Sequence, residues 1–409
     1  MKFTALLSHR RVLAACLLAV ALCLPGLAAS TGGPKPGVMK VVQTKYYTIN
    51  SDMDDDFLAE TWVRLDRMFE DYSLRTAALG RDYKDRLPVY IYSQHEDYLA
   101  AGGLPKSSGV FRHGGGGARL MADVQDDPAG AMQTLQHEEF HQFVWARLGT
   151  NIPVWANEGL ACYFEEALFT GDSFVPGIIG DRFPRLKRMI AQHDYKPFAE
   201  FVEISSLQWR GEMSLRNYAQ AWSMIHFLYH GKPEYRVLFD RYLKLLGSGV
   251  DPSQAWKQVF GTNVAAFEKA WLEYWSTMTP PNPDPLRIQA RALTLVSFGA
   301  RAHAAGVEEF KDADAFFAAA AKGFKLKHDP LHWLPPKLLE DALKDRTEGV
   351  TSWSIKWTKG LPEFTASLAQ TGGGGTIRAG FQNVNGFWRT IALPMPAATM
   401  KPAAKTTQP

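Results

Sequence analysis

Three residues in one short segment have the types and the spacing of a metal site with a general base. His137 and His141 are four residues apart, and Glu138 directly follows the first of them. Because residues four apart lie on one face of an α-helix, both imidazoles can bind the same ion, with Glu138 facing the same cleft. Imidazole nitrogens are common ligands of zinc. The segment therefore predicts a zinc ion held by His137 and His141 on one helix.

Glu158 is the expected third ligand. A zinc ion that catalyses hydrolysis needs three protein ligands and one open position for water. Glu158 follows far enough along the chain for the first helix to end, turn at residues 149–153 and give way to a second helix that returns to the metal. Glu138 would then take a proton from the zinc-bound water and pass it to the leaving amine.

The oxyanion that develops during amide hydrolysis needs a further hydrogen-bond donor. Tyr218 and His226 are the candidates, because they are eight residues apart on one expected helix and can face the same side. We favour Tyr218. The alternative is that both residues belong to an aromatic stripe, with Trp222 between them, that packs in the core.

The pattern of apolar residues predicts the elements that position these side chains. Residues 39–50 should form a strand, and the acidic run 54–56 should start an amphipathic helix. Further strands are expected at 87–92 and 118–124, with a flexible glycine loop at 114–117 before the latter. The expected helices are 130–148, 153–169, 215–230, 235–246 and 264–278. Strands come first and helices follow, which predicts an α+β fold.

A proline-rich linker at residues 279–285 divides the chain, because it cannot continue a helix. The expected parts are a metallopeptidase domain, a helical segment, a small β unit and a disordered tail (38–278, 286–345, 346–394 and 395–409). In the β unit Trp353, Ile355 and Trp357 alternate with polar residues. A one-sided apolar stripe of this kind is more often the core of a strand than a platform for sugars.

Residues 1–29 have the layout of a secretory signal peptide that is cleaved after small residues. The alternative is a membrane anchor, but the apolar run 12–24 is shorter than the roughly 20 residues that span a bilayer. We therefore expect a secreted or periplasmic protein without stable membrane insertion. The export route stays open, since the pair Arg10-Arg11 also occurs in twin-arginine signals.

Removal of that segment changes the charge and the cysteine content. The formal net charge of +3 falls to about zero, which argues against nucleic acid or anionic membranes as partners. Cys16 and Cys23 leave with the signal peptide, so Cys162 would be the only cysteine and no intramolecular disulfide could form.

These motifs resemble those of the gluzincin metallopeptidases, which include thermolysin and the zinc aminopeptidases. The likeness rests on His137-Glu138-x-x-His141 with Asn157-Glu158-Gly159-Leu160-Ala161, and it covers residues 40–278. The segment 218–222 resembles a predicted family of secreted bacterial gluzincin-like proteins without a settled function. The resemblance implies a thermolysin-like zincin fold, with a small mixed sheet over the active-site helix and a helical subdomain after it. It implies a peptide or protein as substrate, and Glu165 and Asn157 as the residues that support the ligands.

Two departures leave the choice between endopeptidase and exopeptidase open. The spacing from His141 to Glu158 is shorter than in the aminopeptidases, and the Gly-x-Met-Glu-Asn segment that holds a substrate N-terminus is missing. Cys162 occupies the position where thermolysin-type enzymes often have an aspartate that orients a histidine. Glu165 could do that instead, because it lies seven residues after Glu158 and so on the same helix face.

Two functions are consistent with these residues. The first is hydrolysis of peptide bonds by a zinc metallopeptidase, with Glu138 as the base. The second is a non-catalytic envelope protein that zinc stabilises and that binds a peptide or a glycan. The presence of Glu138 favours the enzyme, since a purely structural zinc site needs no base.

Overall fold

The computed structural model describes residues 39–79, 83–114, 117–124, 127–178, 181–212, 214–279, 284–327, 332–369 and 374–394. The expected signal peptide, the expected tail at 395–409 and residues 280–283 of the expected linker lie outside the described residues. The chain divides into two compact units. Of the described residues, the first unit holds 39–169, 173–279 and 332–335, and the second holds 170–172, 284–327 and 336–394. None of the described helices is long and apolar enough to cross a membrane.

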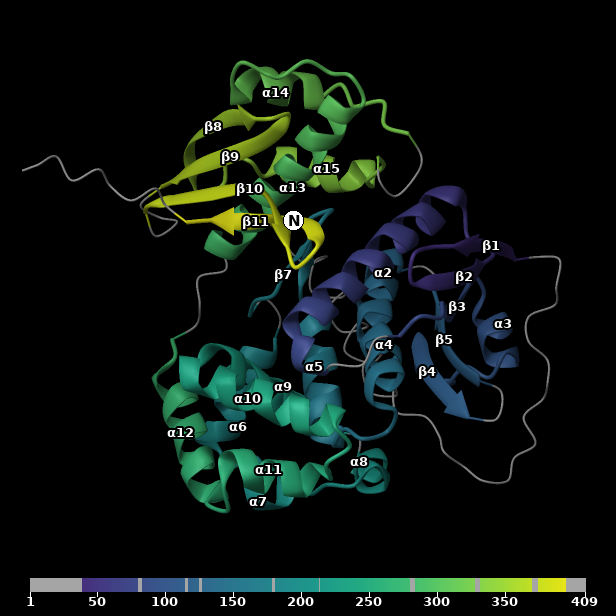
Figure 1. Ribbon diagram of the computed structural model, residues 1–409, viewed down its shortest axis with the longest axis vertical. Helices are drawn as coiled ribbons and strands as arrows, with labels where there is room; N and C mark the ends of the chain where they lie inside the picture. Colours follow the sequence, from purple (N-terminus) through teal and green to yellow (C-terminus); the bar gives the residue numbers. More distant parts are fainter. Residues whose placement is uncertain are drawn as a thin grey trace, which may run out of the picture. The chain divides into compact units, whose positions relative to one another are not determined.

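The first unit is built on a five-stranded mixed sheet (Figure 1). Its strands lie in the order β1-β2-β3-β5-β4, with β2, β3 and β5 parallel and both edge strands antiparallel to their neighbours. Ile49, Val89 and Leu120 are opposite one another across the three parallel strands, and all three are fully buried. The strands are β1 Lys40–Gln43, β2 Tyr47–Ser51, β3 Leu87–Tyr92, β4 Gly109–Gly114 and β5 Gly117–Asp123.

Two long helices pack together in this unit, α2 Asp55–Arg75 and α4 Pro128–Leu148. Helix α2 begins where the side chain of Asp54 accepts a hydrogen bond from the backbone N–H of Phe57, at 2.8 Å. The contact between the helices is aromatic, with the rings of Tyr72 and Phe140 meeting edge to face at 5.2 Å. Helix α4 also packs on β4 and β5, which holds it against the edge of the sheet (Figure 1).

Short helices and a small hairpin complete the first unit. Between the strands lie η1 Ala77–Leu79 and α3 His95–Ala100, and after α4 come α5 Val154–Glu165, β6 Leu168–Phe169, β7 Phe174–Val175, α6 Arg182–Ala191, α7 Phe198–Phe201, α8 Ser206–Glu212, α9 Leu215–His230, α10 Pro233–Gly247, α11 Pro252–Phe260 and α12 Val264–Thr277. Helix α5 packs along α9 as well as on α4. This arrangement of strands followed by helices confirms the predicted α+β class.

Two local predictions were wrong, and one strand was missed. The strand expected at 39–50 is a hairpin, because the side chain of Thr44 accepts hydrogen bonds from the backbone N–H groups of Tyr46 and Tyr47 and so makes a turn. The helix expected at 153–169 ends at Glu165, and the chain continues into the β6–β7 hairpin. Strand β4 was not predicted at all, although it pairs along its whole length with β5.

In the second unit, helix α13 Asp284–Ala304 packs on a four-stranded antiparallel sheet. The sheet order is β11-β10-β9-β8, and the other elements are α14 Ala313–Ala320, α15 Pro336–Lys344, β8 Val350–Thr358, β9 Leu361–Leu368, β10 Thr376–Val384 and β11 Phe387–Leu393. Trp353 and Trp357 are opposite Ala366 and Pro362, and each indole N–H donates to a backbone carbonyl. These tryptophans are therefore part of the packed side of the sheet, as predicted.

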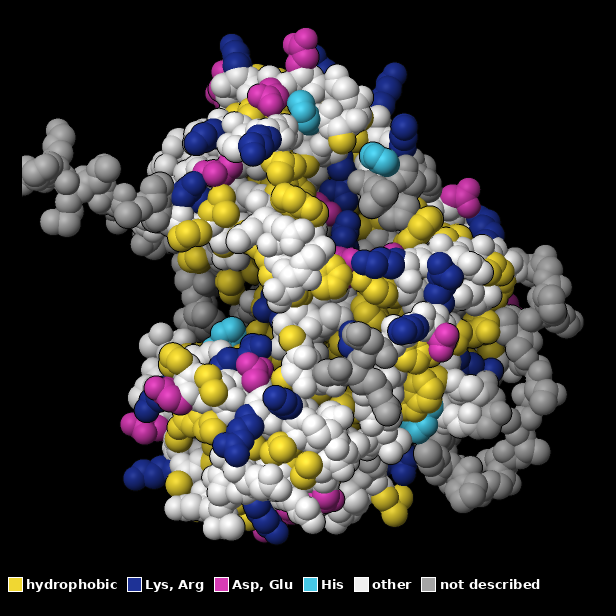
Figure 2. All heavy atoms as spheres, in the orientation of Figure 1, with side chains coloured by type: hydrophobic (Ala, Val, Ile, Leu, Met, Phe, Trp, Pro, Cys, Tyr) yellow, Lys and Arg dark blue, Asp and Glu magenta, His cyan; other side chains and the backbone are white. Residues whose placement is uncertain are grey.

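The charged side chains on the face drawn in Figure 2 are mixed in sign. Lys and Arg side chains are spread among Asp and Glu side chains over that face. This distribution matches the near balance of basic and acidic residues in the sequence.

Candidate functional site

Helix α4 carries the candidate metal ligands and is buried on nearly all sides. Its start is fixed by Asp127, which accepts from the backbone N–H of Gly130, and it ends at Gly149, which has a positive φ of 65°. His137, Glu138 and His141 are each at most 5% exposed. Polar side chains buried to this degree need partners.

The structure brings His137, His141 and Glu158 together. The Nε2 atom of His137 lies 3.5 Å from Oε2 of Glu158, and the Nε2 atom of His141 lies 3.6 Å from the same oxygen. Two ligands of one tetrahedral zinc ion, each about 2.0–2.1 Å from it, lie about 3.3–3.4 Å apart. The three candidate atoms all lie within 4.8 Å of one another. Their spacing therefore suits a single ion of this size.

The same atoms lack other partners. Among the described residues, neither Nε2 atom and neither carboxylate oxygen of Glu158 has a hydrogen-bond partner, although all are buried. Leaving such groups unsatisfied in a protein interior is costly, at about 1–3 kcal/mol each. A bound cation would satisfy all of them at once. The grouping could thus hold a metal ion.

Electrostatics at this group favour positive charge. Burial by itself would raise the pKa of Glu158, but the nearby imidazoles of His141 and His137 outweigh it and lower the pKa to about 2. Burial likewise opposes protonation of His137, yet Cys162 and the two carboxylates of Glu158 and Glu165 raise its pKa well above the ordinary value. The carboxylates that draw protons to these rings would also draw a cation.

The other ring nitrogens have acceptors that fix the orientation of the rings. The Nδ1 atom of His137 lies 2.6 Å from Oε2 of Glu165, and the Nδ1 atom of His141 lies 3.0 Å from Oδ1 of Asn157. Each Nδ1 is therefore engaged in a hydrogen bond, which leaves each Nε2 as the ring nitrogen that could bind a metal ion. Glu165 in turn pairs with Arg182 at 2.9 Å.

A second grouping of His137, Cys162 and Glu165 shares one of these rings. Its Nδ1 to Oε2 distance of 2.6 Å is that of a hydrogen bond, and it is too short for two ligands of one ion. Arg182 places a positive charge on the same carboxylate. Cys162 is fully buried in this position. We therefore take the grouping that contains Glu158 as the candidate metal centre.

Glu138 lies beside the metal centre and is held by the edge of the sheet. Its Oε2 accepts a hydrogen bond of 2.8 Å from the backbone N–H of Phe111, in strand β4. Burial raises the pKa of Glu138 above its usual range, although the neighbouring histidines oppose this. Sequence reasoning missed Phe111, although the adjacent residues Val110 and Phe111 before the glycine run were a signal for the strand.

Two comparisons found no match, and one found a match to part of the chain. Residues 131–245 match a family described as a protein of unknown function (DUF1570). That segment contains every candidate ligand as well as Tyr218 and His226. No curated protein and no solved structure matches this chain.

Tyr218 is next to the metal centre, on helix α9. Its hydroxyl is buried and has no hydrogen-bond partner among the described residues. Burial, reinforced by the charge of Glu158, raises the pKa of this phenol well above 10, so it keeps its proton at neutral pH. The helices approach closely here because Gly159 has no side chain: a Cβ atom there would lie 2.6 Å from the carbonyl oxygen of Ala221.

The structure does not bring His226 to this group. It lies eight residues beyond Tyr218, about 12 Å along the helix axis. Its Nδ1 atom lies 3.2 Å from the hydroxyl of Tyr274, and its ring lies 4.5 Å from that of His230. Of the two candidate donors, only Tyr218 lies close enough to Glu158 and His137 to interact with their charges, and His226 belongs to the aromatic packing of the helical region.

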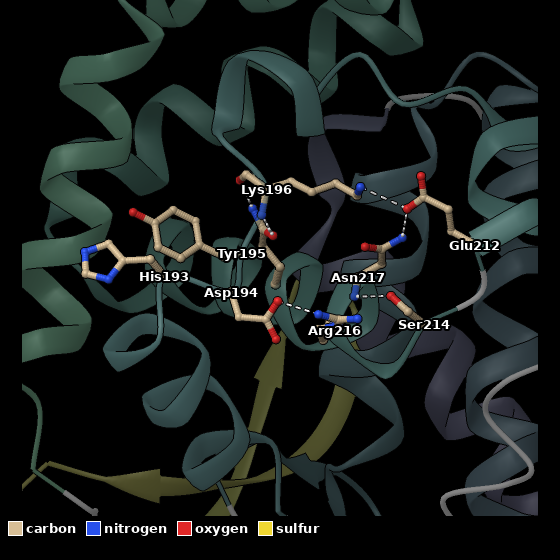
Figure 3. Close-up of a pocket in the computed structure, with 9 residues that line it drawn as sticks. His193, Asp194, Tyr195, Lys196, Glu212, Ser214, Arg216 and Asn217 are labelled. Atoms are coloured by element: carbon tan, nitrogen blue, oxygen red, sulfur yellow. Dashed lines mark hydrogen bonds and ion pairs between the residues drawn. The ribbon is translucent and has the colours of Figure 1, made fainter.

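A polar pocket of about 330 Å³ lies at the start of α9 (Figure 3). Its charges neutralise one another, since Arg216 pairs with Asp194, and Lys196 pairs with Glu212 at 3.0 Å. Gln220 holds the loop that forms one wall, because its side-chain amide bonds both the backbone N–H and the carbonyl of Lys196. None of the metal ligands lines this pocket.

Proposed function

We propose that this protein is a zinc-dependent peptidase that acts after export from the cytoplasm. The observation that carries the proposal is the group of buried, unpartnered ligand atoms on His137, His141 and Glu158, 3.5 and 3.6 Å apart. Two neutral imidazoles and one carboxylate are a typical ligand set of catalytic zinc. Oxygen-preferring ions such as magnesium rarely take two histidines.

Residues of the chain supply the remaining chemistry of amide hydrolysis. A zinc ion bound here would supply Lewis acidity toward water and the substrate carbonyl. Glu138 would take a proton from the attacking water and give it to the leaving amine, and burial favours this because it raises the pKa of the carboxyl group. The hydrogen bond from Phe111 fixes which way the carboxylate points.

Tyr218 would stabilise the oxyanion as charge develops on the carbonyl oxygen. Its phenol keeps its proton and is held in place by the packing of α5 on α9. Among the described residues the hydroxyl has no hydrogen bond that it would have to break before it binds the oxyanion. Such pre-organised donors typically contribute about 10²- to 10³-fold to the rate.

The architecture supports a thermolysin-like zincin fold as part of the proposal. A mixed sheet with an antiparallel edge strand covers the helix with the two histidines, and the third ligand comes from the next helix. The expected signal peptide, which lies outside the described residues, supports a secreted or periplasmic site of action.

The test combines metal analysis with peptide cleavage. The purified protein should contain one zinc per chain by plasma mass spectrometry and should cleave members of a mixed peptide library. A chelator should abolish cleavage, and added zinc should restore it. If the zinc-loaded protein cleaves no peptide of a broad library, the result would instead favour a non-catalytic binding protein.

Two neighbouring substitutions sharpen this test. Glu138→Gln should retain zinc and lose about 10²- to 10⁴-fold in kcat. Glu139→Gln is the matched control: Glu139 is also fully buried, but it accepts from the hydroxyl of Tyr47 on another side of the helix. Burial raises its pKa well above the usual range and so favours the neutral form, which the amide resembles. Cleavage by Glu139→Gln should match that of the wild type.

A further inference from the structure

Three aromatic side chains form a continuous cluster at one end of the metal helix. We call Phe111, His113 and Trp145 the aromatic cluster. The ring of Phe111 lies 5.8 Å from that of His113 and 6.1 Å from that of Trp145, and His113 stacks on Trp145 at 6.1 Å and 27°. Phe111 is buried, whereas His113 and Trp145 are half-buried and so reach the protein surface.

The cluster adjoins the proposed catalytic residues through both of its elements. Trp145 follows His141 by four residues, which places it one turn further along the same side of α4. Phe111 belongs to β4, and its backbone N–H binds Glu138. His113 is two residues further along this strand, and so lies on the same face as Phe111.

The strand face that carries the cluster packs against α4 along its length. Gly109 is on that face too, and a Cβ atom there would lie 2.4 Å from the side chain of Thr134 and 3.3 Å from that of Glu138. The strand therefore runs beside the helix from Thr134 to Trp145. At Gly109 the two elements are too close for any side chain, and further along the strand Phe111 and His113 meet Trp145 of the helix.

The cluster offers an apolar surface without net charge. Burial lowers the pKa of His113 below its ordinary value of 6.5, so the ring is neutral at physiological pH. Neutral aromatic rings attract other rings and large aliphatic groups through edge-to-face and stacked contacts. Half-buried aromatic groups beside a reactive centre are typical of sites that bind an apolar side chain.

We propose that the aromatic cluster binds a large apolar side chain, preferably an aromatic one, of a peptide substrate close to the bond that is cleaved. This inference rests on the proposed peptidase function and names the substrate class of that same site. A peptide fits better than a glycan, because sugar hydroxyls need several polar partners, and the cluster offers only the imidazole of His113 and the indole N–H of Trp145.

The test measures binding in the zinc-loaded Glu138→Gln protein, so that the probe is not consumed. Isothermal titration calorimetry would compare N-acetyl-Ala-Phe-Ala-amide with N-acetyl-Ala-Ala-Ala-amide. We expect the phenylalanine peptide to bind at least 10-fold more tightly. Adding Trp145→Ala should reduce this preference to less than 3-fold, and adding Trp145→Phe, which keeps a ring, should preserve most of it.

Trp388→Ala is the matched control, because Trp388 is a surface tryptophan of the second unit that is 57% exposed. The Trp388→Ala variant should prefer the phenylalanine peptide over the alanine peptide as strongly as the parent protein does. An equal preference in Trp145→Ala and the parent would overturn the inference, as would an oligosaccharide that binds through Trp145 in place of the peptide. If the protein cleaves peptides but shows no preference for aromatic side chains, the peptidase proposal holds and the proposed role of the aromatic cluster is wrong. If the protein binds aromatic peptides preferentially but cleaves none, the role of the cluster holds and the peptidase proposal is wrong.

Discussion

The Nδ1 atom of His137 lies 2.6 Å from the carboxylate of Glu165, which is itself paired with Arg182. A carboxylate at this position fixes the tautomer and the orientation of the ring and makes its other nitrogen a better ligand. Glu165 comes from the last turn of α5, the helix that also supplies Glu158. One helix therefore contributes both a candidate ligand and the carboxylate that orients another candidate ligand.

Glu165→Gln should weaken zinc binding by about 10- to 100-fold, because an amide orients and polarises the imidazole less strongly than a carboxylate does. Competition with a chromophoric chelator would measure the affinity. Glu166→Gln is the control: Glu166 pairs with the same Arg182 but does not contact His137. If both variants lose affinity equally, then Arg182 and the local fold explain the effect, and the contact with His137 does not.

The grouping of the candidate ligands was the part most open to prediction, because ligand type and helical spacing are local in sequence. The spacing of His137 and His141 needs only one helix, and the pairing of Glu165 with His137 follows from helix geometry once Glu158 is accepted as a ligand. The contact between Glu138 and Phe111 is different. It depends on β4 lying at the edge of the sheet beside α4, and no local pattern specifies which strand is at the edge.

The prediction for His226 was wrong because it used only the rule that residues eight apart on a helix can face the same side. Eight residues along a helix keep a side chain near one face but move it about 12 Å along the axis. The direction in which α9 passes α5 then decides which end meets the metal centre. That direction follows from packing at Gly159, where the backbones come close. The sequence alone does not determine it.

Tyr218→Phe should lower kcat by about 10²- to 10³-fold and leave KM for peptides nearly unchanged. The hydroxyl has no partner among the described residues, so its loss should leave the thermal midpoint unchanged or slightly raised. Steady-state kinetics and calorimetric melting separate the two effects. A fall in stability that accompanies an unchanged kcat would show that the phenol is structural.

Gly159→Ala should destabilise the protein by about 1–3 kcal/mol or more, because its Cβ would lie 2.6 Å from the backbone of Ala221 and 2.7 Å from Ile225. The two helices would have to separate, which would also displace Tyr218 from Glu158. Gly211→Ala is the control, since a Cβ at that helical position meets nothing within 4 Å. Denaturant unfolding should show a loss for the first variant only; equal stability of both would contradict the close approach of α5 and α9.

His226 should make the protein less stable in mild acid. Burial, with a smaller contribution from the charge of His230, lowers its pKa to about 3, compared with about 6.5 in an unfolded chain. Below pH 6.5 the unfolded chain therefore binds a proton that the folded protein does not. The free energy of unfolding should fall as pH decreases from 6.5 toward 3, by up to about 1.4 kcal/mol per pH unit from this residue.

His226→Gln isolates this contribution, because glutamine does not titrate. The variant should have a lower stability at pH 7, since it loses the ring contacts with Tyr274 and His230, but a shallower decline between pH 6.5 and 4. Urea unfolding at half-unit pH steps would give both slopes with the metal centre the same in each protein. Parallel slopes would mean that His226 is already protonated in the folded state, and the buried, neutral assignment would be wrong.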